Sequence, residues 1–257
     1  MIPKVLWPLR RLRLRALMSR ELANAGEVWR AYSAGAAPPA LRFRNGQTLH
    51  HGPDDAPVFL FFEIFANGCY RRAMPIPASG VVIDIGANIG SFVLDCAARG
   101  PHVMIHAYEP NPRAFSTLRR NVEANGLSGR VRLFPEAVGG RAGTLRLSVA
   151  GPSLAASAYR AGDEAPDYVD APCVTLQTVV ERAGAIALLK IDAEGAEADI
   201  LSNPRDLSSV AGVIGEYHED LIPGIRARVL LALREAGFTA AATAGGRCGP
   251  LFYAERQ

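Results

Sequence analysis

Residues 81–91 read VVIDIGANIGS, a β-branched run that leads directly into a glycine-rich turn. The run predicts a buried strand, Gly86 leaves space for a ligand beside the backbone, and Gly90 allows the next helix to begin close to the sheet. A second apolar run, residues 103–108, is followed by Glu109. A carboxylate at the tip of the neighbouring strand can accept hydrogen bonds from both hydroxyls of a ribose. The pattern therefore predicts a site for an adenosine-containing ligand at the carboxyl edge of a parallel sheet.

Residue types that the turn lacks narrow the choice of ligand. A dinucleotide-binding turn needs a glycine where this chain has Asn88, and a P-loop needs a Gly-Lys-Ser/Thr sequence that does not follow here. The Asp84 carboxylate would repel a diphosphate but suits the ammonium or sulfonium group of S-adenosylmethionine (SAM). The turn thus favours SAM, with candidate contacts at Asp84, Gly86, Asn88, Gly90 and Ser91. The alternative is a tight strand-to-helix turn of an unrelated α/β protein.

Four segments together resemble the FkbM-type methyltransferases in their order and spacing. They are residues 82–90, 108–111, 136–139 and 189–197, which read VIDIGANIG, YEPN, EAVG and LKIDAEGAE. The resemblance covers roughly residues 58–257 and implies a class I SAM-dependent methyltransferase with a Rossmann-like, doubly wound α/β sheet. Such enzymes are commonly O-methyltransferases of sugars, polyketides or other natural products, and their second product is S-adenosylhomocysteine (SAH). The resemblance also implies that Glu63 and Tyr70 face the methionine end of the cofactor.

From residue 81 onward, strand and helix patterns alternate, which indicates a doubly wound sheet. Strands are expected near 81–86, 103–109, 131–135, 187–192, 210–217, 237–243 and 250–255, with an added strand at 144–149. Helices are expected near 90–99, 112–125, 177–184, 195–202 and 223–236. Residues 151–170 carry no pattern, and we expect them to cover the substrate opening.

Residues 1–57 lie outside the resemblance and are expected to form an N-terminal helical and hairpin extension of the catalytic domain, residues 58–257. Apolar residues at helical spacing predict one helix over 14–32, and Asn45-Gly46 predicts a hairpin. A further helix is expected over 57–66. The first helix has three readings: packing on the catalytic domain, a homodimer contact or substrate lid, and a basic helix on a membrane surface.

Composition limits the class of protein. The 257 residues are 49% hydrophobic and 21% charged, which suits one α/β core with an extension. The formal charge of +3 predicts no nucleic-acid partner. No apolar stretch approaches the roughly 18 residues of a membrane span, and arginines interrupt the N-terminal leucines, so neither stable membrane insertion nor a secretory signal is expected. The widely spaced Cys69, Cys96, Cys173 and Cys248 predict reduced thiols in a cytoplasmic protein.

Ionisable residues gather at the ends of the fourth and fifth parallel strands, where the fold places a substrate. Lys190 lies in an apolar run and needs a partner, which we expect to be Glu216 or Glu194. His218 is the favoured general base because an imidazole pKa of about 6.5 allows it to accept a proton at neutral pH. Asp192 is expected to hold the sulfonium or amine of the cofactor, and Glu216 to orient the imidazole.

A divalent cation is an open alternative at this edge. Asp192, Glu194, Glu216 and His218 have suitable donor atoms for Mg²⁺. No Asp-Asp-Asn arrangement marks a dedicated site, and the neighbouring lysine can neutralise the carboxylates. A metal is therefore possible but not favoured.

The remaining cofactor contacts are expected at the ends of the second and third strands. Glu109 is expected to bind the ribose, and Pro110 ends its strand. Asn111 either caps the next helix or contacts the adenine. Glu136 is positioned to accept a hydrogen bond from the adenine amine, and Ala137 leaves room for the ring.

Small-molecule O-methylation is the leading hypothesis, with N- or C-methylation as near variants. The alternative is a catalytically silent SAM-fold protein that docks to a biosynthetic partner. A nucleic-acid methyltransferase should show an Asn/Asp-Pro-Pro-Tyr motif where this chain has DAEG at residues 192–195, and the missing glycine argues against a nicotinamide dehydrogenase. The sequence does not identify the methyl acceptor.

Overall fold

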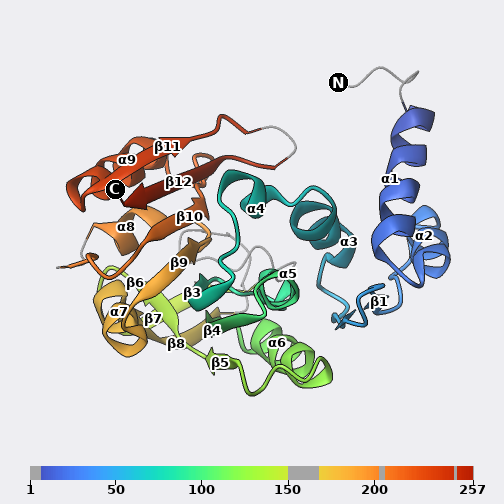
Figure 1. The fold of residues 1–257 in the computed structure, drawn as a ribbon, viewed down its shortest axis with the longest axis horizontal. Coiled ribbons are helices and arrows are strands. Elements are labelled where there is room, and N and C mark those ends of the chain that lie inside the picture. The colour runs from blue at the N-terminus through green and yellow to red at the C-terminus, as the bar shows by residue number, and fades with distance from the viewer. Residues whose placement is uncertain (1–6, 150–167, 203–205, 246–247, 257) are drawn as a thin grey trace.

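The computed structural model describes residues 7–149, 168–202, 206–245 and 248–256. Its central sheet has the strand order β11-β12-β10-β9-β3-β4-β5, in which β12 runs antiparallel to both of its neighbours and the other pairings are parallel (Figure 1). The strands are β3 (Ser79–Ile85), β4 (His102–Tyr108), β5 (Val131–Phe134), β9 (Ile186–Ile191), β10 (Gly212–Glu216), β11 (Phe238–Ala242) and β12 (Leu251–Arg256). All seven lie close to the predicted positions.

Side-chain alternation divides the core into two layers, one on each face of this sheet. Val82 and Leu188 point to one face, where they join the apolar cluster that covers α5 and α6. Ile83 and Leu189 point to the other face, against α7, α8 and α9. The five helices are α5 (Ser91–Arg99), α6 (Pro112–Ala124), α7 (Leu176–Ala183), α8 (Glu197–Leu201) and α9 (Ile225–Glu235). The predicted doubly wound α/β architecture is confirmed.

A smaller three-stranded sheet adjoins the main one. It consists of β6 (Ala137–Gly139), β8 (Tyr168–Thr175) and β7 (Gly143–Ser148), in that spatial order. Strand β7 confirms the added strand expected at residues 144–149. Strand β8 was not expected from the sequence pattern. The predicted cover of the substrate opening, residues 151–170, lies outside the described residues except for its last three.

The N-terminal helix predicted over residues 14–32 is two helices, α1 (Trp7–Glu21) and α2 (Ala25–Ser33). The break has a tertiary cause. Leu22 forms a β-bridge with Phe43, and the Asn24 side chain accepts from the Arg42 amide and donates to the Ala40 carbonyl. The helix therefore ends where the chain pairs with the hairpin of β1 (Leu41–Arg42) and β2 (Thr48–Leu49). This hairpin confirms the one predicted at Asn45-Gly46.

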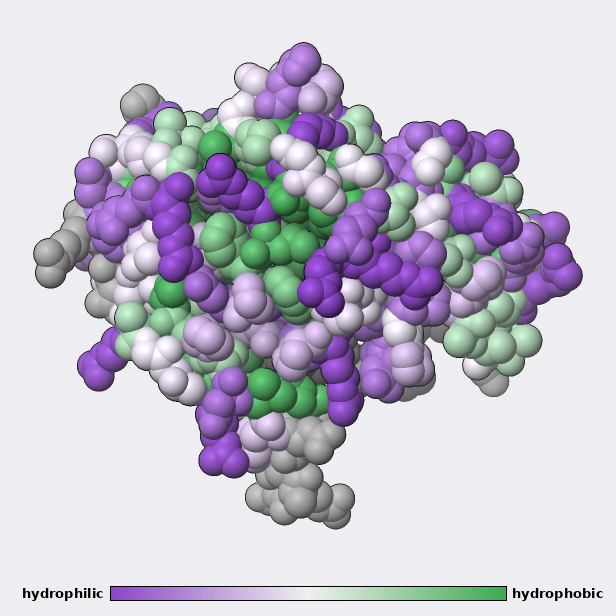
Figure 2. All heavy atoms as spheres, turned by 90° about the horizontal axis from the view of Figure 1, so that it is seen from below, coloured by the Kyte–Doolittle hydropathy of each residue, from purple (hydrophilic) through white to green (hydrophobic). Residues whose placement is uncertain are grey.

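The extension shares a core with the rest of the chain. Met18, Leu22 and Val28 are fully buried and belong to the same apolar cluster as Phe61 and Val82. The start of α1 projects away from the body (Figure 1), and Leu12 there is exposed. In Figure 2 this region, at the right, shows hydrophilic and weakly hydrophobic side chains, whereas the strongest apolar patch lies near the middle of the body. No described helix has both the length and the apolar composition needed to cross a membrane.

Two truncated chains should show that the two parts of α1 contribute differently to stability. We expect a chain without residues 1–13 to keep its thermal stability within a few degrees, because Leu12 and Arg13 are exposed. A chain truncated through Tyr32 should be much less stable, since it loses the buried Met18, Leu22 and Val28. Thermal denaturation of both proteins checks this expectation, and equal melting temperatures would contradict it.

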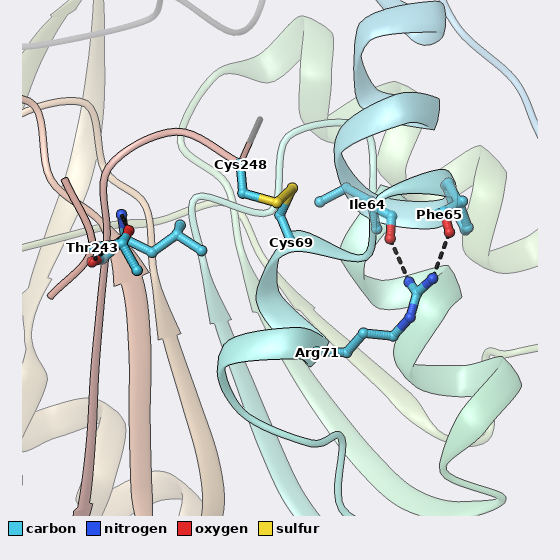
Figure 3. Close-up of a disulfide and its surroundings, with 7 residues drawn as sticks. Ile64, Phe65, Cys69, Arg71, Thr243 and Cys248 are labelled. Carbon is cyan, nitrogen blue, oxygen red and sulfur yellow. Dashed lines mark hydrogen bonds between the residues drawn. A yellow bond between two sulfur atoms is a disulfide. The ribbon is translucent and has the colours of Figure 1, made fainter. Parts of the chain in front are cut away.

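The segment before β3, residues 57–73, is helical, and its last helix contacts the carboxyl end of β9. The helix expected over 57–66 is α3 (Pro57–Leu60), which continues as a π-helical turn, η2 (Phe61–Ala66), and α4 (Cys69–Ala73) follows. The Arg71 guanidinium donates to the carbonyls of Ile64 and Phe65, both at 2.6 Å, and pairs with Asp95 at 3.1 Å. These bonds fix the end of the π-helical turn, an element often found at functional sites (Figure 3).

The prediction of four reduced cysteines is wrong for one pair. Cys69, at the start of α4, forms a disulfide with Cys248, which lies between β11 and β12 (Figure 3). The partners are 179 residues apart in sequence, so only the fold brings them together. Cys96 and Cys173 are free and buried.

Candidate active site

A cavity of about 700 Å³, including its part open to solvent, lies at the carboxyl ends of β3, β4 and β9. Glu109 and Pro110 line one region, and Asp192 and Glu194 line another. The other predicted residues on its wall are Gly86, Asn88, Glu136 and Ala137. The structure therefore joins the predicted cofactor residues of four separate segments in one cavity.

Glu109 is held rigidly at the tip of β4. One carboxylate oxygen accepts a hydrogen bond from the backbone N–H of Asn88 and the other from the backbone N–H of Asn111, each at 2.8 Å. Burial raises the pKa of Glu109 to about 7, although these two amides act in the opposite direction. Asn88 adopts a left-handed conformation, with φ of 49°, that directs its amide to the carboxylate. The Asn111 side chain caps α6 by accepting from the Arg113 amide, so its capping role is confirmed.

The two glycines of the turn serve chain packing. A Cβ atom at Gly86, where φ is 75°, would collide with the Asp192 carbonyl oxygen. A Cβ atom at Gly90 would lie 2.7 Å from Leu118, so this glycine lets α5 start close to the neighbouring helix α6, whereas the expected close approach was to the sheet. Ser91 is buried and does not line the cavity.

Asp84 does not reach the cavity wall either. Its side chain is fully buried and pairs with Lys190 at 2.9 Å, and Lys190 also approaches Asp192 at 3.5 Å. The lysine donates to the Gly86 carbonyl at 2.8 Å. The expected partners of Lys190, Glu216 or Glu194, are wrong, because β3 and β9 are adjacent and place Asp84 directly opposite Lys190. Burial acts to lower the pKa of Lys190, but the two aspartates outweigh it and raise that pKa.

At the adenine end expected from the sequence, Glu136 and Ala137 line the cavity. The Glu136 carboxylate forms an ion pair with Arg182 of α7. A carboxylate oxygen can accept more than one hydrogen bond, so this pair still allows Glu136 to accept from an exocyclic amine.

A histidine–carboxylate cluster lies at the ends of β9 and β10. His218 Nδ1 lies 3.0 Å from Glu197 of α8, and Nε2 lies 3.6 Å from Glu194 and 3.9 Å from Asp192. Glu197 is fully buried and accepts from the amides of Ala193 and Gly195. Glu197 ends the LKIDAEGAE segment but is not among the site residues expected from the sequence. Glu216, expected to orient the imidazole, does not hold that position.

This cluster changes the charge expected for His218. Burial acts to lower its pKa, but hydrogen bonds to Glu194 and Glu197 and the charge of Asp192 raise the pKa of His218 to about 11. The assumption that this imidazole keeps its ordinary pKa is therefore wrong. At neutral pH His218 is an imidazolium, which holds carboxylates and cannot accept a proton.

Two further carboxyls and a tyrosine complete the site. Burial, and then the charge of Asp192, raise the pKa of Glu63 to about 7 and that of Glu216 to about 8. Tyr70 donates to Asp192 Oδ2 at 3.0 Å, so α4 contacts the end of β9. Neither Glu63 nor Tyr70 is among the residues that line the cavity, so their placement at the methionine end of the cofactor stays a prediction.

The donor atoms of Asp192, Glu194 and His218 lie within 4.8 Å of one another. Their types suit a divalent cation such as Mg²⁺. The imidazolium form of His218 is an alternative to an ion here, because its Nε2 side faces Asp192 and Glu194 and its single positive charge offsets part of their negative charge.

Comparison with known proteins identifies the family. The family model described as the methyltransferase FkbM domain matches residues 84–240. The chain belongs to the FkbM methyltransferase family. It is 33% identical over 236 residues to the 31-O-demethyl-FK506 methyltransferase FkbM of Streptomyces tacrolimicus, covering 79% of this chain and 89% of that protein. It is 28% identical over 214 residues to the methyltransferase sdnD of Sordaria araneosa, covering 70% and 81% of the two chains.

Among solved structures, a precorrin-6y C5,15-methyltransferase of Geobacter metallireducens GS-15 is similar with a TM-score of 0.45 and 10% identity, covering 74% of this chain and 89% of that one. FkbM family membership, together with the strand order of the central sheet, identifies a class I SAM-dependent methyltransferase. The family and fold expected from the sequence are thus confirmed.

Glu109 gives a direct test of the cofactor site. We expect Glu109→Gln to weaken SAM binding by about 1–3 kcal/mol, because the amide loses one acceptor oxygen and cannot satisfy both backbone amides and the ribose. Calorimetric titration with SAM measures the effect. Glu123→Gln, on the exposed side of α6, is the matched control and should bind SAM normally. An unchanged affinity in the Glu109 variant would refute the ribose assignment.

Proposed function

We propose that this FkbM-family enzyme transfers the SAM methyl group to a hydroxyl of a small molecule, a sugar, polyketide or other natural product. The observation that carries the proposal is one cavity whose wall includes the rigid Glu109 cradle and the carboxylates Asp192 and Glu194. Adenosine binds by Glu109, Glu136 and Ala137 in this proposal, which directs the methionine end toward Asp192. The family relative named for 31-O-demethyl-FK506 supports a hydroxyl acceptor.

The site supports methyl transfer mainly through charge and position. The sulfonium of SAM is cationic, and the carboxylates Asp192 and Glu194, which line the cavity, provide negative potential at its end of the site. Their charge also holds the acceptor hydroxyl as a hydrogen-bond donor, with its oxygen free to attack the methyl carbon. Correct alignment of the two reactants provides much of the acceleration in such a displacement.

A carboxylate is the proposed proton acceptor. His218 is already protonated at neutral pH, so it positions Asp192 and Glu194 and leaves the acceptor's proton to another group. Glu216 ends β10 beside this cluster, and with a pKa of about 8 its carboxylate form, the minor form at pH 7, is more basic than an ordinary glutamate and far more accessible than neutral His218. Glu216 is therefore the general base in this proposal, and Lys190 and Asp192 are positioning groups.

The test is SAH formation with a panel of acceptors. The panel contains 31-O-demethyl-FK506, simple methyl glycosides and amine analogues of both. We expect SAH to form with at least one hydroxyl acceptor, and the product to carry its new methyl group on oxygen by mass spectrometry and NMR. Methylation of the amines alone would replace O-transfer by N-transfer. SAM binding without turnover on any acceptor would favour the silent, partner-docking alternative.

A further inference from the structure

The Cys69–Cys248 disulfide connects two segments that both contact the acceptor end of the site. Cys69 directly precedes Tyr70, whose hydroxyl donates to Asp192 Oδ2 at 3.0 Å. Cys248 directly precedes Gly249, which packs against Glu216. The bridge thus spans from the α4 side of the acceptor end to the β11–β12 side (Figure 3).

The contact on the β12 side is close. Gly249 has φ of 64°, and an added Cβ atom there would lie 2.5 Å from Glu216 Oε1. The next residues are fixed to the strand that carries Glu216, because the Tyr217 amide donates to the Pro250 carbonyl at 3.0 Å and Leu251 pairs with Glu216. Cys248 and Gly249 precede this paired stretch, so a movement of these two residues would change the surroundings of the Glu216 carboxyl while β12 stays in place.

The two bridged residues differ in burial. Cys69 is 1% exposed, whereas Cys248 is only partly buried. A reductant would therefore approach the bridge from the Cys248 side, because Cys69 belongs to the buried core next to the helical segment that Arg71 fixes. Exchange with an external thiol begins by attack on one of the two sulfur atoms.

We propose that this disulfide is a reversible brace that positions Tyr70 and Glu216, so that its reduction impairs the acceptor end while leaving the adenosine end intact. The inference rests on the proposed function, because it assigns Glu216 to the acceptor end. Glu109, which is held by amides of the β3–α5 turn and of the β4–α6 turn, has no contact with either bridged segment in the described structure.

The chemical step needs a dithiol reductant. Its thiolate attacks the Cys248 sulfur, the S–S bond breaks, and the electron pair leaves on the Cys69 sulfur, which takes a proton. The second thiol of the reductant then attacks the mixed disulfide, which releases Cys248 as a thiol and the reductant as its cyclic disulfide. Two electrons and two protons pass to the protein, and reoxidation reverses the change.

Two cofactor analogues test the proposal without a known acceptor. SAH has a neutral thioether, whereas sinefungin carries an ammonium where SAM carries its methyl-bearing sulfonium, so only sinefungin reports on the charge near Asp192 and Glu216. Calorimetry compares both compounds on the protein prepared without reductant and after dithiothreitol. We expect the oxidised protein to prefer sinefungin and reduction to lower that preference about fivefold or more, with less than a twofold change in SAH affinity.

Variants provide the controls. The double variant Cys69→Ala/Cys248→Ala should show the reduced behaviour without any reductant, and Cys173→Ala, in β8, should respond to reductant as wild type does. If the double variant does not fold, the wild-type comparison still decides. If the disulfide is such a brace, its reduction should also lower kcat with little change in the KM for SAM.

Four outcomes would overturn the inference. Unchanged affinities for both compounds on reduction would show that the bridge does not act on the acceptor end, and an equal loss for both compounds would show that it only stabilises the fold in general. Alkylation of both Cys69 and Cys248 in the native, unreduced protein would show that the bridge does not form. Failure of both compounds to bind the oxidised protein would instead refute the proposed function itself, and the inference with it.

Discussion

Lys190→Met should lower the free energy of unfolding by about 3–5 kcal/mol. The methionine has similar length but no charge, so it leaves the fully buried Asp84 carboxylate without its counter-ion at 2.9 Å. For a chain of this size the loss corresponds to a fall in melting temperature of roughly 6–20 °C. Denaturant titration and thermal unfolding both measure it.

The partner substitution identifies the cause. In the double variant Asp84→Asn/Lys190→Met no buried charge lacks its partner at this position, so the loss should be clearly smaller than the sum of the two single losses. Arg228→Met removes the exposed pair with Asp199 and should cost no more than about 1 kcal/mol. If the loss of unfolding free energy in the double variant equalled the sum of the two single losses, the proposed coupling between Asp84 and Lys190 would be contradicted.

The Asp84–Lys190 pair also shows what could be predicted from the sequence. The strands were found because buried parallel strands read as apolar runs that end at recognisable turns. Once β3 and β9 are taken as neighbours, their register places Asp84 opposite Lys190. The pairing of Lys190 with Asp84 can therefore be predicted from the order and register of the strands, whereas the expected partners Glu216 and Glu194 follow only from positions at or after the strand ends.

Other features depend on contacts that no local pattern carries. The helix break at Asn24 follows from hydrogen bonds to the hairpin, and Pro172 interrupts the apolar pattern of β8. The disulfide joins segments that are far apart in the chain. The pKa of His218 is the balance of burial against three carboxylates, two from the loop after β9 and one from α8, so the sequence places the residue at the site but does not set its charge.

Glu216→Gln should lower the rate of methyl transfer by a factor of about 10²–10⁴, the usual contribution of a general base, with little change in SAM affinity. The base must be ionised to accept the proton. In the wild type the rate should therefore rise with pH through the Glu216 pKa of about 8 and fall below it. His218 stays protonated in this range, so no separate rise should occur near its ordinary pKa.

The two residues can be distinguished by their pH profiles. The positive charge of His218 lowers the pKa of Glu216, so His218→Gln should move the rise to higher pH while retaining it. Glu216→Gln should abolish the rise. Initial rates between pH 6 and 9, at saturating SAM, provide the measurement. If the Glu216 variant kept the wild-type profile while His218→Gln lost the rise, the imidazole would be the base after all, because only the group that accepts the proton can remove the pH dependence when it is replaced.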